Sequence, residues 1–313
     1  MRSRSQYTGP MTGSTKATRS IDETAVAAVQ RRLARDASPP WLHTEVAGRM
    51  AERLLLFKTP PSRMVDWSSF LGASAQRLTT TFPNSALIAI EPSDLLAERS
   101  RVLLRSPWWT PRRWKAPAAE VALESAPPPE NVQLVWANMV LHGVTAPPLL
   151  MQHWHRMLSP GGFAMFSCLG PDTVRELTAL YARLQWPEPT IAFVDMHDLG
   201  DMLVHAGFAD PVMDQERLSV HWDSAAALCR DLRLLGGNVS PHRYPGLRTP
   251  RWQAALHVAL DSLRDNSGRY ALTFEIVYGH AFKTEPRASK PAETQVPLGE
   301  MRRLLQSARK TVV

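Results

Sequence analysis

The sequence predicts an α/β fold built on a mostly parallel, doubly wound sheet with helices on both faces and a helical cap. Short apolar segments of strand length alternate with helical segments between residues 41 and 170. This alternation is typical of parallel sheets, in which each strand returns through a crossover helix. Two of the apolar segments are closed by a carboxylate, at Asp66 and Glu91, and ligands in such folds bind at the carboxyl ends of the strands. The segment 222–265 breaks the alternation with helices alone, which predicts the cap.

The strands are expected where apolar residues run together between turn-forming residues. These segments are 63–66, 87–90, 132–137 and 163–169, and a last strand at 272–281 is expected at the end of the sheet. Helices are expected between them, at 41–57, 73–82, 94–104 and 147–158. The first helix places apolar residues at a spacing of three and four, as an amphipathic helix requires, at Val46, Met50, Leu54 and Phe57.

Residues 161–214 hold the most informative part of the chain. The strand after the Pro-Gly-Gly turn reads GGFAMFSCLG, and the following PDTVREL predicts a helix whose Thr173 and Glu176 fit a capping box. The later segment FVDMHDLGDMLVHAGFADPVMD predicts an amphipathic helix closed by Gly207 and then a short strand. Together these segments closely resemble the malonyl-acyl-carrier-protein O-methyltransferases of biotin synthesis. They resemble more loosely other methyltransferase-fold proteins, among them a mitochondrial hydroxylase that assists respiratory complex I.

The resemblance covers roughly residues 40–282 and implies a Rossmann-like class I methyltransferase sheet. It also implies S-adenosylmethionine as cofactor, a malonyl group on acyl carrier protein as substrate and partner, and a cytoplasmic enzyme. The expected organisation is a disordered leader with a short helix over 1–40 and a methyltransferase-like domain over 41–282. Residues 171–265 would contribute the cap, and 283–313 would form a basic flexible tail.

The resemblance also assigns residues to the cofactor. In class I methyltransferases an acidic residue and a glycine-rich loop follow the first strand, and an acidic residue after the second strand holds the ribose hydroxyls. The matching positions here are Asp66, Ser68, Gly72, Glu91 and Asn138. Near the third strand, Glu120 and Glu124 offer no clear counterpart of the family's adenine-contacting aspartate.

Phe70 departs most from the family, because it stands where the loop has its middle glycine. A side chain there occupies space that a glycine leaves open for close approach of backbone and ligand. A working enzyme therefore requires a loop that carries the Phe70 ring away from the crevice between Asp66, Glu91 and Asn138. The alternative is a non-catalytic methyltransferase-fold paralogue that acts as a binding or assembly factor.

The implied reaction makes few demands on side chains. A carboxylate with a pKa of about 4 is already ionised near neutral pH, so its methylation needs no general base, and no catalytic residue is assigned. The substrate carboxylate does need a cation, and Arg230 is the first choice, with Arg233 and Arg243 also near the cap. His142 and His197 are further candidates for lining the substrate pocket.

Composition argues against several other classes of protein. The formal net charge is +7, but the tails 1–20 and 283–313 each carry +4, so the body between them is near −1 and a nucleic-acid-binding face is not expected. Two cysteines form no disulfide framework and suit a reducing compartment. No His, Cys and Asp spacing indicates a metal site. The segment 105–117, rich in tryptophan and arginine, is either an insertion packed over the fold or a docking surface for an acidic partner or a membrane.

Overall fold

The computed structural model describes residues 20–55, 57, 59–105 and 119–285. The expectations about the leader before residue 20, the segment 106–117 and the tail after residue 285 lie outside these residues. Among the described residues, no helix combines the length and the hydrophobicity that crossing a membrane would take.

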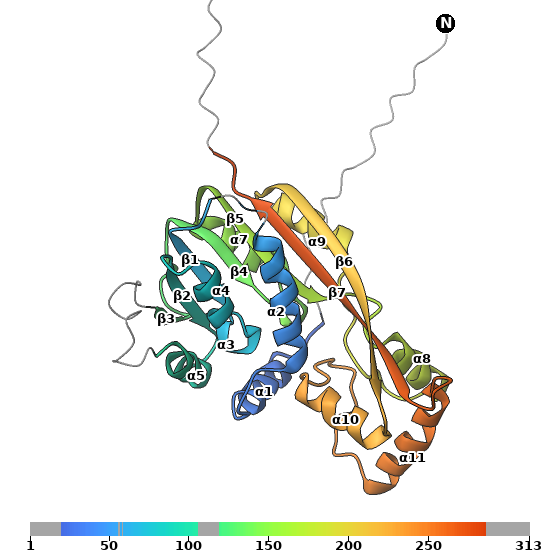
Figure 1. Cartoon of the computed structure of the whole chain (residues 1–313). Coiled ribbons are helices and arrows are strands. Elements are labelled where there is room, and N and C mark those ends of the chain that lie inside the picture. Colours follow the sequence, from blue (N-terminus) through green and yellow to red (C-terminus); the bar gives the residue numbers. More distant parts are fainter. Residues whose placement is uncertain (1–19, 56, 58, 106–118, 286–313) are drawn as a thin grey trace, which may run out of the picture.

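The described residues form a sheet of seven strands in the order β3-β2-β1-β4-β5-β7-β6. The first five run parallel, β7 runs antiparallel to β5, and β6 runs antiparallel to β7. This is the expected mostly parallel sheet, and Figure 1 shows β6 and β7 as a long hairpin that extends beyond the other strands. The strands are β1 (Arg63–Trp67), β2 (Ala86–Glu91), β3 (Glu120–Leu123), β4 (Val132–Ala137), β5 (Leu158–Leu169), β6 (Ala209–Trp222) and β7 (Tyr270–Phe282).

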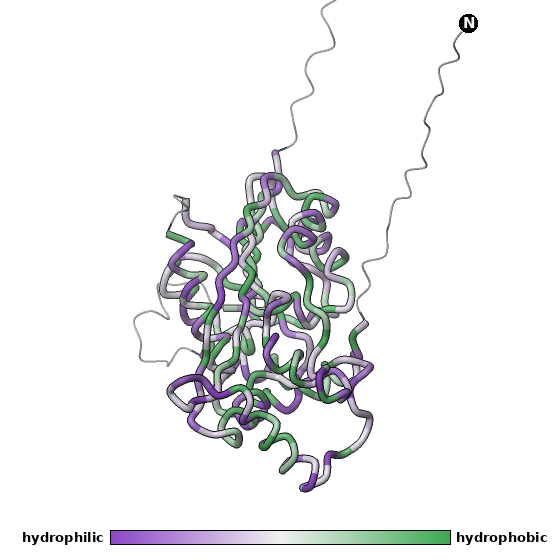
Figure 2. Tube along the Cα trace, turned by 90° about the vertical axis from the view of Figure 1, so that its right-hand side faces the viewer, coloured by the Kyte–Doolittle hydropathy of each residue, from purple (hydrophilic) through white to green (hydrophobic). Residues whose placement is uncertain are grey.

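Side chains alternate between two cores because successive residues of a strand point to opposite faces. On β1, Met64 joins the core on one face and Val65 joins the core on the other. Leu134 and Val135 repeat this alternation on β4, which is buried on both faces. In Figure 2 apolar stretches run through the middle of the molecule, as this two-sided burial requires.

Helices cover both faces of the sheet. The helical residues of one core include those of α2 (Trp41–Leu54) and α4 (Ala75–Thr81), and those of the other include residues of α7 (Pro147–Met157) and α9 (Met196–His205). The expected helix 94–104 is α5 (Asp94–Leu104), which packs beside β2 and β3. Gly207 follows the end of α9 with a φ of +100°, a conformation that favours glycine and stops the helix as expected.

Three helices gather at the far end of the β6–β7 hairpin: α8 (Arg175–Arg183), α10 (Ala225–Leu234) and α11 (Pro250–Leu260). The last two are inserted between β6 and β7, which explains why 222–265 lacks strands. A short helix, α1 (Glu23–Leu33), lies near α10 at the same end of the molecule (Figure 1). Two 3-10 turns, η1 (Leu141–Gly143) and η2 (Asp261–Leu263), complete the described elements with α3 (Ser69–Gly72).

Two local expectations were wrong. The strand after Gly207 is long rather than short, since β6 pairs with β7 as far as Trp222. The capping box is also absent: Val174 occupies the N-cap position of α8. The Thr173 hydroxyl donates instead to the Glu275 carbonyl at 3.1 Å, and the Glu176 carboxylate accepts the Thr273 amide at 3.0 Å. Both side chains therefore anchor α8 to β7 rather than cap it.

Candidate active site

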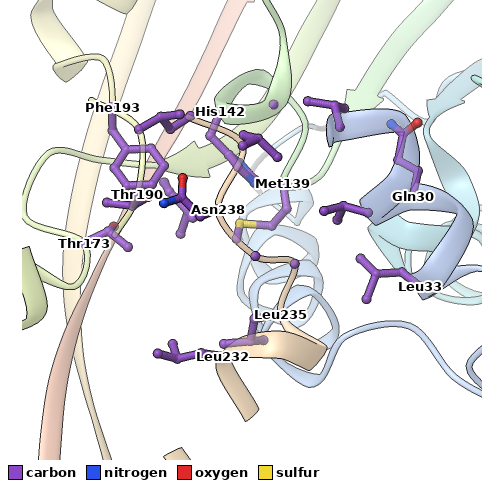
Figure 3. A pocket seen from close by; sticks show the side chains of 18 of the residues that line it. Gln30, Leu33, Met139, His142, Thr173, Thr190, Phe193, Leu232, Leu235 and Asn238 are labelled. Atoms are coloured by element: carbon purple, nitrogen blue, oxygen red, sulfur yellow. The ribbon is translucent and has the colours of Figure 1, made fainter. Parts of the chain in front are cut away.

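A cavity of about 930 Å³ opens at the carboxyl ends of the parallel strands. The segments that follow β1, β2, β3 and β4 all contribute to its wall, and the cap closes it from the other side. In Figure 3, His142, Thr190 and Phe193 lie opposite Gln30 and Leu33 of α1. The wall residues after the four strands include Ser68, Gly72, Pro92, Glu124, Asn138 and Met139, and those of the cap include Tyr181, Leu228, Arg233 and Trp252.

The segment after β1 bends sharply and then forms the short turn α3. Ser68, in place of the family's first glycine, has a φ of 56°, in the left-handed region. Gly72 follows where the chain comes close to β4, since a Cβ at this position would lie 3.2 Å from Ser74 Oγ and 3.4 Å from the Asn138 carbonyl oxygen. A side chain at position 72 would therefore press against the Ser74 hydroxyl, which a glycine avoids.

The Phe70 ring points away from the cavity. It is 1% exposed and packs in a cluster with Leu33, Ala34 and Leu96. The Arg99 guanidinium lies over its face, 4.7 Å from the ring centroid. The ring is not part of the cavity wall, so it does not occupy the cavity.

Two buried carboxylates lie beneath this loop. Asp66 accepts the Ser69 hydroxyl at 2.6 Å, and Glu91 accepts the Phe70 amide at 2.7 Å and the hydroxyl of Ser100. Both residues are fully buried, and neither belongs to the cavity wall. The second oxygen of each, Asp66 Oδ1 and Glu91 Oε2, has no hydrogen-bond partner among the described residues.

Burial dominates the electrostatics of this pair. It raises the pKa of Glu91 to about 7, although the hydrogen bonds from Ser100 and the Phe70 amide act in the opposite direction. Burial also raises the pKa of Asp66 well above its ordinary value, and the nearby charge of Glu91 adds to the effect. Burying two acceptor oxygens without a donor costs free energy of folding. Carboxylates with strongly raised pKa values are typical of functional sites.

Asn138 joins three segments of the site. Its amide group donates to the His43 carbonyl at 2.8 Å and to the Gly72 carbonyl at 2.6 Å, while its oxygen accepts the Ser167 hydroxyl at 2.7 Å. Asn138 is 1% exposed and lies on the cavity wall. It therefore holds α2, the loop after β1 and β5 in register around the cavity.

His43 belongs to the same arrangement, although no expectation from the sequence concerned this residue. Its Nδ1 lies 2.8 Å from the Leu71 carbonyl oxygen, which can only accept, so Nδ1 carries the proton. Burial lowers the pKa of His43 to about 4, and the ring is neutral at physiological pH. The sequence feature that could have indicated His43 was its position beside Leu42 on the buried face of an amphipathic helix.

Glu124 is a second residue that the sequence left unassigned. It follows β3 directly, lies on the cavity wall, and its amide donates to the Glu91 carbonyl at 2.9 Å. Burial raises the pKa of its carboxyl group. Glu120, by contrast, begins β3 and does not reach the cavity.

The residues expected to bind the substrate separate into two groups. His142 lies on the wall, and its ring makes edge contacts with His43 and Phe193, each at a centroid distance of 6.4 Å. Arg230 and His197 do not reach the cavity. Arg230 is exposed on α10, whose buried face is formed by Ala225 and Leu228; the His197 side chain is 80% exposed and pairs with Asp195.

Arg233 is an exposed residue of the same helix that, unlike Arg230, contributes to the cavity wall. It lies about one turn further along α10. Arg243, the remaining candidate near the cap, forms an ion pair with Asp22 at 2.7 Å. Among the described residues no cluster of His, Cys, Asp or Glu could hold a metal ion.

Comparisons with known proteins identify the family and the fold. Residues 42–210 match the family model described as a methyltransferase domain. The chain is 37% identical over 253 residues to the malonyl-[acyl-carrier protein] O-methyltransferase of Laribacter hongkongensis, covering 79% of this chain and 84% of that one. Enzymes of the same name from Gallionella capsiferriformans (34% identity, 80% and 86% covered) and Legionella pneumophila (30%, 82% and 89%) are also similar.

Among solved structures, the YcgJ protein of Bacillus subtilis has the same fold. It superposes with a TM-score of 0.50 at 11% identity, over 77% of this chain and 99% of that one. A protein from Bacillus halodurans gives a TM-score of 0.51 at 11% identity, over 76% and 99%. At this level of identity the similarity concerns the fold alone.

Proposed function

The chain belongs to the malonyl-[acyl-carrier protein] O-methyltransferase family, and from this premise we propose that it methylates the free carboxylate of a malonyl thioester on acyl carrier protein. The methyl donor is S-adenosylmethionine, and the product is a methyl ester of the kind that biotin synthesis uses. The observation that carries the proposal is the cavity at the carboxyl ends of the strands, whose wall contains Ser68, Gly72 and Asn138.

The residues at this edge of the sheet fit the cofactor chemically. Asp66 Oδ1 and Glu91 Oε2 have no hydrogen-bond partner among the described residues, and they lie beneath the loop after β1, outside the cavity wall. The ribose hydroxyls and the ammonium group of S-adenosylmethionine are donors that could bind these oxygens once the loop shifts to uncover them. A carboxylate can accept two such hydrogen bonds at once. We assign Glu91 to the ribose and Asp66, Ser68, Gly72 and Asn138 to the methionine side.

Glu124 extends the same assignment. It is on the cavity wall beyond the end of β3, next in the sheet to the strand that carries Glu91. This is the edge where the family places the adenine ring, so Glu124 is proposed as the polar residue at that end. When bound, the cofactor supplies a methyl group attached to a sulfonium, and the protein provides alignment.

Methylation of the substrate carboxylate needs no general acid or base from the residues that line the cavity. A malonyl carboxylate is ionised near neutral pH and attacks without help from a base. Neutral His43 leaves such an anion unprotonated. The cap residues Tyr181, Leu228 and Trp252 present largely apolar surface, which excludes water and strengthens any charge interaction inside. The chain's contribution is therefore orientation of the carboxylate oxygen toward the methyl group.

Arg233 is the cation proposed to orient the carboxylate, and Arg230 offers a matched control on the same helix. Arg233→Met keeps the apolar stem and removes the charge, so a charge-assisted hydrogen bond worth about 1.5–3 kcal/mol is lost. The KM for malonyl-acyl carrier protein is expected to rise by about tenfold or more. Arg230→Met should leave it unchanged, because Arg230 is outside the cavity.

The experiment measures transfer of a labelled methyl group from S-adenosylmethionine to malonyl-acyl carrier protein, with acetyl-acyl carrier protein as the control acceptor. Label is expected on the malonyl form alone, as a base-labile ester. Equal labelling of the acetyl form, which has no free carboxylate, would contradict the proposed reaction. Equal effects of the two arginine substitutions would show that Arg233 does not hold the substrate.

A further inference from the structure

Helix α1 forms one side of the ligand cavity although it belongs to neither face of the sheet. Val26, Val29, Gln30 and Leu33 of this helix line the cavity. Figure 3 shows Gln30 and Leu33 across the open space from Phe193 and Thr190. A ligand in the cavity would therefore be enclosed by α1 on one side, and removing α1 would open this side to solvent.

Polar contacts tie the α1 region to the C-terminal end of α10 and to the segment after it. The Asp22 amide donates to the Val239 carbonyl at 3.0 Å, and the Asp22 carboxylate pairs with Arg243 at 2.7 Å. Arg32 donates to the Arg233 carbonyl at 2.8 Å. These contacts are exposed or partly exposed, and such pairs usually contribute less than about 1 kcal/mol each. Alone they would hold the helix only weakly.

The apolar contacts of α1 are concentrated at its C-terminal end, where Phe70 is the largest side chain. The cluster contains Leu33, Ala34, Phe70, Leu71 and Leu96, with Val29 packed against it. Aromatic rings bury more apolar area than any aliphatic residue of such a cluster. Phe70 is thus the largest single apolar contact that holds the C-terminal end of α1 in place.

Arg99 strengthens this arrangement from α5. Its guanidinium lies over the Phe70 ring and donates to the carbonyls of Asp36 at 2.7 Å and Ala37 at 3.0 Å, just after α1. The chain then passes through Pro39 and Pro40 into α2. Phe70 and Arg99 therefore fix the point from which α1 extends over the cavity.

We propose that α1 is a lid over the ligand cavity and that Phe70 is the positioning residue that seats it. Phe70 is itself part of the loop after β1, where its backbone amide donates to the Glu91 carboxylate. Phe70 thus couples the loop beneath the cofactor to the helix above it, and this explains how an aromatic residue serves where the family has a glycine. Only the identity of the ligand rests on the proposed function; the seating of α1 does not.

Hydrogen exchange of the α1 amides tests the proposal without any cofactor. Phe70→Ala is expected to accelerate exchange in residues 23–33 by about tenfold or more, and Phe70→Leu, which keeps an apolar side chain, should stay closer to the wild type. Phe82→Ala is the matched control, since Phe82 is also buried but belongs to the core beneath α4. It should leave exchange in α1 at the wild-type rate.

Arg99→Met provides a second test if Phe70→Ala folds poorly, because it removes only the contacts to the ring face and to the chain after α1. It should also accelerate exchange at the C-terminal end of α1. If hydrogen exchange in α1 is unchanged in both Phe70→Ala and Arg99→Met, the proposal that Phe70 seats α1 as a lid is wrong. Equal acceleration of this exchange by Phe82→Ala would contradict it as well. Loosening of α1 in a chain that transfers no methyl group would support the lid and contradict the proposed function instead.

Discussion

Replacing Glu91 with glutamine is expected to stabilise the fold above pH 7 while it weakens cofactor binding. Burial raises the pKa of Glu91 from an ordinary 4.5 to about 7, so the folded chain holds a proton that the unfolded chain releases. Glutamine keeps an oxygen that can accept from the Phe70 amide, and it carries no charge to bury. It loses the second carboxylate oxygen that would accept from a ribose.

The sign of the pH dependence follows from proton linkage. Between pH 4.5 and 7 the folded state binds more protons than the unfolded state, so the free energy of unfolding falls as pH rises. The full penalty of about 3 kcal/mol is present above pH 7, and Glu91→Gln should recover much of it there and little at pH 4. The nearby charge of Glu124 also raises the pKa of Glu91 and acts in the same direction.

Urea unfolding at pH 4 and pH 8 measures this effect, with Glu98→Gln as the control. Glu98 lies on the neighbouring helix α5, and its side chain is 66% exposed, so its substitution should change stability little at either pH. A Glu91→Gln chain that is less stable at pH 8 than the wild type would contradict the account. It would mean that the charged carboxylate stabilises the loop.

Replacing Asn138 with alanine is expected to lower stability and ligand affinity together. The substitution removes the donor for the His43 and Gly72 carbonyls and the acceptor for the Ser167 hydroxyl. Leaving buried polar groups without partners costs about 1–3 kcal/mol each, less where water enters from the cavity, so a loss of about 3 kcal/mol is expected. Because Gly72 is released, the loop after β1 loses its fixed distance from β4.

Thermal unfolding and cofactor titration of the same variant measure the two effects. Asn84→Ala is the control, since Asn84 is an exposed residue of the loop before β2. Asn138→Asp adds a sharper test, because a carboxylate has the shape of the amide but cannot donate to two carbonyls. Wild-type stability in Asn138→Ala would show that the three segments are held together without it.

The sequence was sufficient to predict the parallel sheet and the edge of the sheet at which the cavity opens. Apolar residues recur at different spacings in strands and in helices, so the alternation of strands and helices along the chain can be recognised from the sequence alone. The carboxylates Asp66 and Glu91 and the amide of Asn138 do converge beneath or beside one cavity. Their convergence follows from the rule that parallel strands present their carboxyl ends at one edge.

Other features depended on packing that local patterns do not record. Arg230 and Arg233 are three residues apart, so on a helix they lie only about 60° from each other, and which one faces the cavity depends on how α10 packs. Thr173 and Glu176 fit a capping box, but β7 lies close enough to take both side chains. His43 gained its role only because the loop after β1 brings the Leu71 carbonyl to it.

The same reason explains Phe70. From sequence, an aromatic residue in a glycine loop left open whether its ring fills the cofactor crevice, and it gave the non-catalytic paralogue its main support. The structure places the ring in a pocket formed with Leu33 and Leu96. These residues lie in helices on either side of the loop in sequence, so no local pattern could indicate the pocket.

Calorimetric titration of the wild-type chain with S-adenosylhomocysteine tests the central claim most directly, that this cavity binds the cofactor with Phe70 turned aside. We expect one binding site per chain, weakened by about tenfold or more in Glu91→Gln, which corresponds to one lost hydrogen bond to a charged group, and unchanged in Glu98→Gln. The absence of binding by the wild type, together with binding gained in Phe70→Gly, would contradict the claim. It would show that the loop with phenylalanine closes the cofactor site.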